Sequence, residues 1–191
     1  MDNNQLNASS QEIDVMIVVD TDYVKDYIKA RNITPSTDKN NPVGIDHKSQ
    51  YMIVPSAHIA TGQATADLNF KGRDGDTVCF RGCSVSQNSD DAIIIYRVKK
   101  YDGVDVFYGN PFQYEFVDRT IAAVPDPKSS DRDGMPSVPG NVTFPSLDAR
   151  IGQVGTGSYY IYFALYTLDP KDSSKQTLYS YCYWDPTITV H

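Results

Sequence analysis

Apolar residues along the chain fall into short runs and alternating stretches, separated by polar segments rich in Gly, Pro, Asp and Ser. The run Ile13–Val19 is almost continuously apolar, which predicts a strand buried in the centre of a sheet. A short helix is predicted over Asp22–Arg31, with Thr21 as its N-cap. We interpret Asp20-Thr-Asp22 as a strand exit and helix cap, in preference to a metal or phosphate position.

Five further strands are predicted by alternation and by β-branched runs. They cover Gln50–Val54, Ala64–Phe70, Thr77–Val85, Ala92–Lys99 and Phe112–Val117. The stretch Ala123–Gly140 is rich in Pro, Asp, Ser and Gly. It is predicted to be a loop longer than most connections in compact domains, which is typical of functional or mobile loops.

The stretch Ser158–Val190 predicts two aromatic strands joined by a polar turn, and it holds seven of the fourteen tyrosines. On its first strand, Tyr159 and Phe163 share one face, while Tyr160 and Tyr162 share the other. A strand that is apolar on both faces must be covered on both. One face is expected in the core, and the other needs a second layer, a partner subunit or a ligand.

Together these elements predict an all-β fold, an antiparallel, jelly-roll-like β-sandwich with one short helix after the first strand. An α/β fold is the alternative, because the first strand is followed by a helix, but no second strand–helix alternation follows. We expect residues 1–11 to be a disordered lead and residues 12–191 to form a single domain.

The charge narrows the range of partners. The 191 residues include 24 acidic and 17 basic side chains, for a net charge of -7. This balance argues against nucleic acids and anionic membrane surfaces. The polar N-terminus has no signal-peptide pattern and no apolar run is long enough to cross a bilayer, so we expect a cytoplasmic protein with reduced cysteines.

The sequence contains no strong signature of a metal or catalytic site. Cys79 and Cys83 lack the usual zinc spacing and a second pair. Asp131 and Asp133 resemble the start of a calcium loop, to which Asp74, Asp76, Asp90 and Asp91 could add oxygens, but no acidic residue closes an EF-hand. No Gly-x-Ser-x-Gly elbow is present, and pairs of aspartates are too easily drawn from this composition to indicate a hydrolase. We expect no cofactor, no metal and no enzymatic activity.

The candidate functional residues are therefore aromatic. They are Tyr160, Tyr162, Tyr166, Tyr181 and Trp184. Such side chains are enriched in cores and at subunit interfaces, and they also stack on sugar rings. The three hypotheses that remain are core packing, self-association, and a small-ligand or carbohydrate site to which Asp131 and Asp133 contribute polar contacts.

Three blocks of the sequence resemble the PixA/AidA family of bacterial inclusion-body proteins. They are Ile13-Asp-Val-Met-Ile-Val-Val-Asp-Thr-Asp22, Asn41-Pro-Val-Gly-Ile-Asp-His-Lys-Ser-Gln-Tyr-Met52, and the end, Tyr160-Ile-Tyr-Phe-Ala-Leu-Tyr166 with Tyr181-Cys-Tyr-Trp-Asp-Pro186. These are structural motifs without catalytic character, spread over nearly the whole chain after the polar lead.

The resemblance implies a non-catalytic protein of host-associated bacteria that accumulates in the cytoplasm, often under quorum-sensing control, and in some members packs into crystalline inclusions. The residues themselves favour a related expectation: a sandwich with an exposed aromatic stripe can pair with itself, and such a homodimer can be the unit of an ordered array, a two-fold arrangement being the commonest for homo-oligomers. The name-giving members are rich in methionine, whereas this chain has only four, Met1, Met16, Met52 and Met135. A role as a methionine reserve is therefore not expected here.

Overall fold

The computed structural model describes residues 10–191, without the side chains of residues 109–111, 121 and 122. Its contacts divide it into two compact units. The larger unit combines residues 10–113 with Leu147–His191, and the smaller unit is Tyr114–Ser146. The strands β7 and β8 both contribute residues to each unit.

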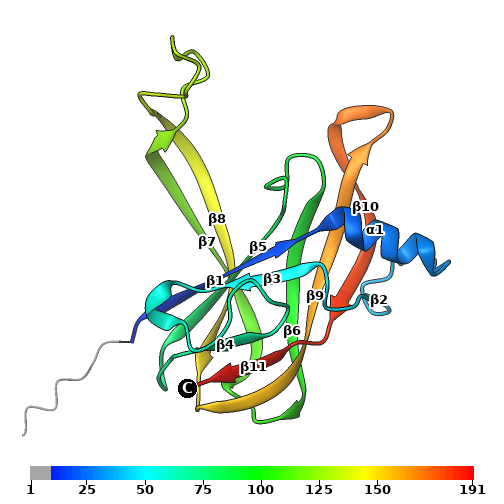
Figure 1. The fold of residues 1–191 in the computed structure, drawn as a ribbon, viewed down its shortest axis with the longest axis vertical. Helices are drawn as coiled ribbons and strands as arrows, with labels where there is room; N and C mark the ends of the chain where they lie inside the picture. The colour runs from blue at the N-terminus through cyan, green and yellow to red at the C-terminus, as the bar shows by residue number, and fades with distance from the viewer. Residues whose placement is uncertain (1–9) are drawn as a thin grey trace, which may run out of the picture. The chain divides into compact units, whose positions relative to one another are not determined.

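The first sheet contains five strands, and β1 lies inside it (Figure 1). In spatial order they are β3 (Gln50–Ile53), β1 (Glu12–Val19), β5 (Thr77–Ser84), β8 (Val138–Ile151) and β7 (Phe107–Val124). β1 pairs antiparallel with β3 and parallel with β5. The predicted central position of the first strand is thus confirmed.

The second sheet contains six strands built around β9 (Gly155–Asp169). The others are β2 (Val43–Gly44), β10 (Asp172–Trp184), β11 (Thr187–Val190), β4 (Leu68–Phe70) and β6 (Ala92–Gly103). β9 pairs antiparallel with β10, β11 and β6, so its backbone is bonded along most of its length. A short 3-10 helix, η1 (Ser56–His58), precedes β4.

The helix α1 (Thr21–Ala30) follows β1, as predicted, but Asp20 is its cap and Thr21 is its first residue. The Asp20 carboxylate accepts a hydrogen bond of 3.0 Å from the backbone N–H of Tyr23. A carboxylate is a good N-cap and its charge is favourable at a helix N-terminus, which explains the shift by one residue. The helix buries Val24 and Ile28.

The core lies between the two sheets of the larger unit and follows from period-two alternation. β1 alternates between exposed and buried residues, and on β9 Tyr159, Ile161 and Phe163 are buried. Trp184 of β10 is completely buried against Phe163, and its indole N–H donates to the carbonyl of Ala66 at 3.1 Å. Trp184 is therefore a core residue, which corrects its assignment to a surface for partners or ligands.

The structure confirms a β-sandwich with one α-helix, and it shows that both sheets are mixed. Three pairings are parallel: β1 with β5, β2 with β10, and β4 with β11. The predicted lead lies mostly in residues 1–9, outside the described residues. Gln11 is held in place, because its backbone and side-chain N–H groups both donate to the Asp76 carboxylate.

The predicted loop Ala123–Gly140 is shorter than expected, because β7 continues to Val124 and β8 begins at Val138. Within the smaller unit, the Thr120 hydroxyl donates to the Asn141 side chain at 2.8 Å, and the Thr143 hydroxyl donates to Asp118. β8 contains Pro139, Gly140 and Pro145. These residues are typical of turns, and for this reason the pattern did not predict a strand.

Candidate functional site

The outward side of the second sheet carries a cluster of tyrosines that we call the tyrosine face. Its members come from β6, β9 and β10 and are Tyr96, Tyr101, Tyr160, Tyr162, Tyr181 and Tyr183. Strand pairing brings them together, since Tyr162 lies opposite Tyr183 on β10 and opposite Arg97 on β6. All six are partly exposed to solvent, Tyr101 the most.

Ring contacts run through the whole tyrosine face. Tyr101 stacks on Tyr160 with 4.3 Å between ring centroids, and Tyr160 meets Tyr183 edge-on at 5.2 Å. Tyr162 contacts Tyr96 at 5.9 Å, and Tyr96 contacts Tyr181 at 5.5 Å. Offset and edge-to-face pairs of this kind hold the rings in fixed orientations, so the surface is preorganised.

Arg97 places a guanidinium against the rings of the tyrosine face. Its guanidinium carbon lies 4.0 Å from the ring centroid of Tyr162 and 5.7 Å from that of Tyr96. Its Nε atom is buried without a hydrogen-bond partner among the residues that the structure describes. Burial raises the pKa of Tyr96 to about 12, and the charge of Arg97 opposes that rise. Arg97 thus presents a positive charge, stacked on aromatic rings and lacking a carboxylate partner in the described chain.

The structure brings together only part of the predicted aromatic set. Tyr160, Tyr162 and Tyr181 lie on the tyrosine face, whereas Tyr166 makes no ring contact with them among the described residues. The sequence analysis missed Tyr96, Tyr101, Tyr183 and Arg97 as members of this surface. The Tyr-x-Tyr spacing of Tyr181 and Tyr183 was an available signal for one face, whereas β6 has a register shift between Ile95 and Arg97 that its sequence does not reveal.

The other predicted contacts, Asp131 and Asp133, belong to the smaller unit. Asp133 accepts a hydrogen bond of 2.9 Å from the backbone N–H of Met135 and one of 3.3 Å from the Ser129 hydroxyl, which makes it a turn-forming residue. In the described part of the chain, no group of three or more His, Cys, Asp or Glu residues could hold a metal ion.

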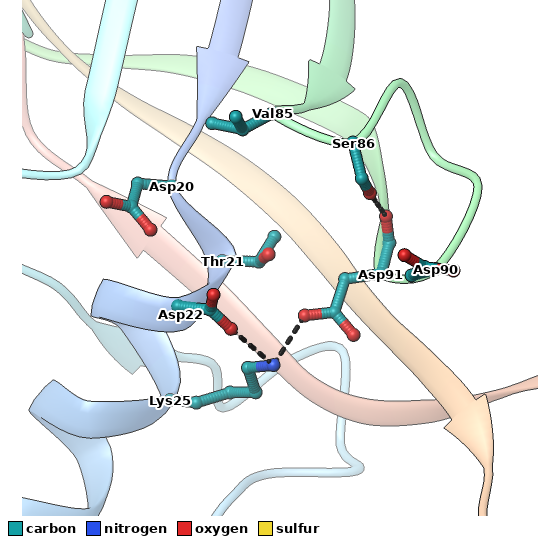
Figure 2. A pocket seen from close by; sticks show the side chains of 8 residues that line it. All are labelled: Asp20, Thr21, Asp22, Lys25, Val85, Ser86, Asp90 and Asp91. Atoms are coloured by element: carbon teal, nitrogen blue, oxygen red, sulfur yellow. Dashed lines mark hydrogen bonds and ion pairs between the residues drawn. The ribbon is translucent and has the colours of Figure 1, made fainter.

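A pocket of about 500 Å³ lies where the chain leaves β1 and β5 (Figure 2). It is lined by Asp20, Thr21, Asp22, Lys25, Val85, Ser86, Asp90 and Asp91. β1 and β5 are parallel neighbours, so their carboxyl ends deliver two acidic segments to the same edge of the sheet. The sequence contains both acidic pairs, but it does not show that they meet.

Lys25 links the two sides of this pocket. Its ammonium lies 2.9 Å from the Asp22 carboxylate and 2.6 Å from that of Asp91 (Figure 2). Burial disfavours the charged ammonium, but hydrogen bonds and charge attraction from Asp91 and Asp22 outweigh it and raise the pKa of Lys25. Lys25 therefore stays protonated and holds the helix against the loop that follows β5.

That loop is itself fixed by side chains. The Asn88 side-chain oxygen accepts hydrogen bonds from the backbone N–H groups of Ser84 at 2.8 Å and Ile93 at 3.0 Å. The Ser84 hydroxyl donates to the carbonyl of Asp91 at 2.6 Å. From β10, Gln176 donates to the carbonyls of Asn88 and Asp90, both at 2.9 Å. The wall of the pocket is thus preformed.

No helix in the described part of the chain is long and apolar enough to span a membrane.

Comparison with known proteins identifies the relatives of this fold. A search of the curated proteins finds no match. Among solved structures, the chain is similar to the crystal structure of an inclusion body protein, PixA, from Burkholderia cenocepacia J2315. The TM-score is 0.71 and the identity 24%, over 97% of this chain and 99% of that one. The family model described as "PixA: Inclusion body protein" matches residues 11–190. The chain therefore belongs to the PixA family of inclusion body proteins.

Proposed function

We propose that this protein is a non-catalytic, self-assembling protein that accumulates in cytoplasmic inclusions, and that a second copy covers the tyrosine face. The observation that supports this most directly is the tyrosine face itself. Its rings are fixed in place and partly exposed, and tyrosine is a residue type enriched at protein interfaces. Membership of a family named for inclusion bodies favours a second copy of the chain as the occupant.

The charges of the chain also favour a second copy as the partner of the tyrosine face. Arg97 brings a cation to the centre of the tyrosine face, and the chain as a whole carries a net charge of -7. A carboxylate from another copy would give Arg97 the partner that the described chain does not supply. Arg pairs with carboxylates and stacks on rings at the same time, and such residues often dominate the affinity of an interface.

The test is sedimentation velocity over a wide concentration range. The wild type is expected to form dimers and larger species as its concentration rises. Replacing Tyr160→Ser and Tyr162→Ser together should raise the dissociation constant about tenfold or more. Met16→Ser is the control, because Met16 is an exposed apolar residue on the outward side of the first sheet, away from the tyrosine face.

The Arg97→Gln variant separates charge from ring packing in the same experiment. It should weaken association severalfold and make it less sensitive to salt, because an ion pair between copies is screened by added salt. A wild type that remains monomeric at high concentration would contradict the proposal. Equal effects of Met16→Ser and the double tyrosine variant would also contradict it.

A carbohydrate-binding role is the second candidate, and one observation favours it. Tyr101 is 46% exposed and lies stacked on Tyr160, which forms a flat aromatic surface of the kind that sugar rings stack on. A glycan array, with and without a chelator, tests this role. Binding that is lost in Tyr101→Ser would support it, and no binding under either condition would rule it out.

A further inference from the structure

The smaller unit, Tyr114–Ser146, has no core of its own. Among its described side chains, only that of Ser146 is buried. Its backbone is a ribbon of two strands, because β8 pairs with β5 only over Leu147–Arg150. Two strands alone are at best marginally stable in water, and a third strand or another packed element normally covers their apolar side. The smaller unit is therefore a candidate for contact with another molecule.

Aromatic rings and a carboxylate share one face of this ribbon. Phe116 is 66% exposed, and its ring is stacked on that of Tyr114 with 5.6 Å between centroids. Asp118 lies on the same face, since alternate residues of a strand point to the same side. Its carboxylate accepts a hydrogen bond from the Thr143 hydroxyl and forms no ion pair with any residue that the structure describes. The ribbon thus presents a ring and an uncompensated negative charge two residues apart.

The tyrosine face carries the opposite charge. Arg97 stacks on Tyr162, and Lys39 adds an ammonium 6.0 Å from the ring centroid of Tyr96. Within the described part of the chain, neither cation forms an ion pair. In the smaller unit, by contrast, five acidic residues outnumber three basic ones. The two surfaces are therefore complementary in charge, and aromatic rings are exposed on both.

A second tyrosine face would be a poorer occupant of the tyrosine face. In a two-fold contact the same side chains approach from both copies, so the cations of one copy would meet those of the other. Like charges brought together across an interface are unfavourable. β6 contains three cationic residues and a single carboxylate, that of Asp102, which already accepts a hydrogen bond from the backbone N–H of Gly103. The acidic ribbon of the smaller unit is the better match.

We infer that the smaller unit of one copy docks on the tyrosine face of another copy. Phe116 packs against the rings of Tyr160 and Tyr162. Asp118 pairs with Arg97. The spacing agrees, because side chains two residues apart on a strand repeat about every 7 Å, and the ring centroids of Tyr160 and Tyr162 are 6.2 Å apart. The inference rests on the proposed function and names the part of the second copy that covers the tyrosine face. Such a head-to-tail contact can extend from copy to copy, as an ordered array requires.

Mixing two variants in a sedimentation velocity experiment tests the inference, because two different surfaces can complement each other. Phe116→Ser loses the docking ring and keeps the tyrosine face. The double variant Tyr160→Ser, Tyr162→Ser loses that face and keeps Phe116. Each alone should associate about tenfold or more weakly than the wild type. An equimolar mixture, with one variant fluorescently labelled, should form a one-to-one complex with nearly the affinity of the wild-type contact.

A double-mutant cycle tests the ion pair. Asp118→Asn keeps an oxygen that can accept from Thr143 and removes the charge, so it should weaken association severalfold. Arg97→Gln should have a similar effect. If the two side chains pair, the chain with both substitutions should associate no more weakly than either single variant. Additive losses would overturn the pairing of Asp118 with Arg97.

Met135→Ser is the matched control, because Met135 belongs to the same unit and is 61% exposed. It should associate as the wild type does, and equal weakening by Met135→Ser and Phe116→Ser would overturn the inference. A mixture that associates no more tightly than either variant alone would also overturn it, as would a Phe116→Ser variant that associates like the wild type. Both of these results would leave the proposed function standing, whereas a wild type that remains monomeric would overturn both.

Discussion

The two faces of β9 use the same residue type in different ways. On the inward face, Tyr159 is 1% exposed and its hydroxyl accepts a hydrogen bond of 3.0 Å from the backbone N–H of Val106. On the outward face, Tyr160 contacts other rings, and no hydrogen bond of its hydroxyl is found among the described residues. Neighbouring tyrosines thus lie in different environments, one in the core and one on the tyrosine face.

The comparison teaches that aromatic content alone does not identify a core. The inward face of the second sheet is filled by Trp184, Phe163 and Ile161, which are completely buried. The outward face is equally aromatic but half-exposed, and the guanidinium of Arg97 is stacked on its rings. If this distinction is correct, substitutions on the inward face should change stability, and substitutions on the outward face should change association.

The largest effect is expected from Trp184→Ala. This change removes the largest buried side chain and the hydrogen bond to the carbonyl of Ala66. The free energy of unfolding should fall by about 3–5 kcal/mol, as for other large-to-small changes in cores. Urea denaturation followed by circular dichroism measures it. A loss below about 1 kcal/mol would contradict the placement of Trp184 in the core.

A smaller effect is expected from the pair Tyr159→Phe and Tyr160→Phe, which remove the same hydroxyl from opposite faces. Tyr159→Phe leaves the buried N–H of Val106 without its partner and should cost about 1–3 kcal/mol. Tyr160→Phe should change the free energy of unfolding by no more than about 0.5 kcal/mol. Equal losses in the two variants, measured in the same urea titrations, would remove the distinction between the faces.

The smallest effect on the free energy of unfolding at neutral pH is expected from the ionisation of Cys182. This residue is completely buried on the inward face of β10. Burial raises the pKa of its thiol to about 12, well above the ordinary range of a thiol. The unfolded chain therefore loses this proton at lower pH than the folded chain does. The resulting stabilisation is complete below about pH 9 and is lost as the pH rises to about 12, with a slope of up to about 1.4 kcal/mol per pH unit.

Denaturation titrations of the wild type and Cys182→Ala, at pH values from about 8 to about 11, measure this slope. The range begins near the pKa of an ordinary thiol and extends about two units above it. The variant should have a shallower decline in the free energy of unfolding than the wild type, whatever constant offset the lost sulfur causes. Parallel curves would show that the Cys182 thiol does not contribute to the alkaline instability of the fold.

The sequence predicts those parts of the fold that follow from local periodicity. β1 and the aromatic strands β9 and β10 have strong alternation or continuous apolar runs, and all three were predicted. β8 was not, because Pro139 and Pro145 resemble turn residues and its pairing with β5 joins segments far apart in the chain. Parallel pairings such as β4 with β11 are equally invisible to local patterns.

The candidate sites show the same limit. Tyr181 and Trp184 are three residues apart on one strand, so period-two geometry alone places them on opposite faces, and grouping them was an avoidable error. Tyr101 and Tyr160 meet only because β6 pairs with β9, and Asp20 and Asp90 line one pocket only because β1 pairs with β5. Non-local contacts of this kind require the tertiary structure.

The burial of Trp184 has a practical consequence, since it is the single tryptophan of the chain. Its fluorescence should be blue-shifted in the native protein and shift to the red when the sandwich opens. Because it lies on the opposite side of the sheet from the tyrosine face, assembly of folded copies should leave its emission wavelength unchanged. The molecule thus carries an internal optical probe that reports unfolding separately from assembly.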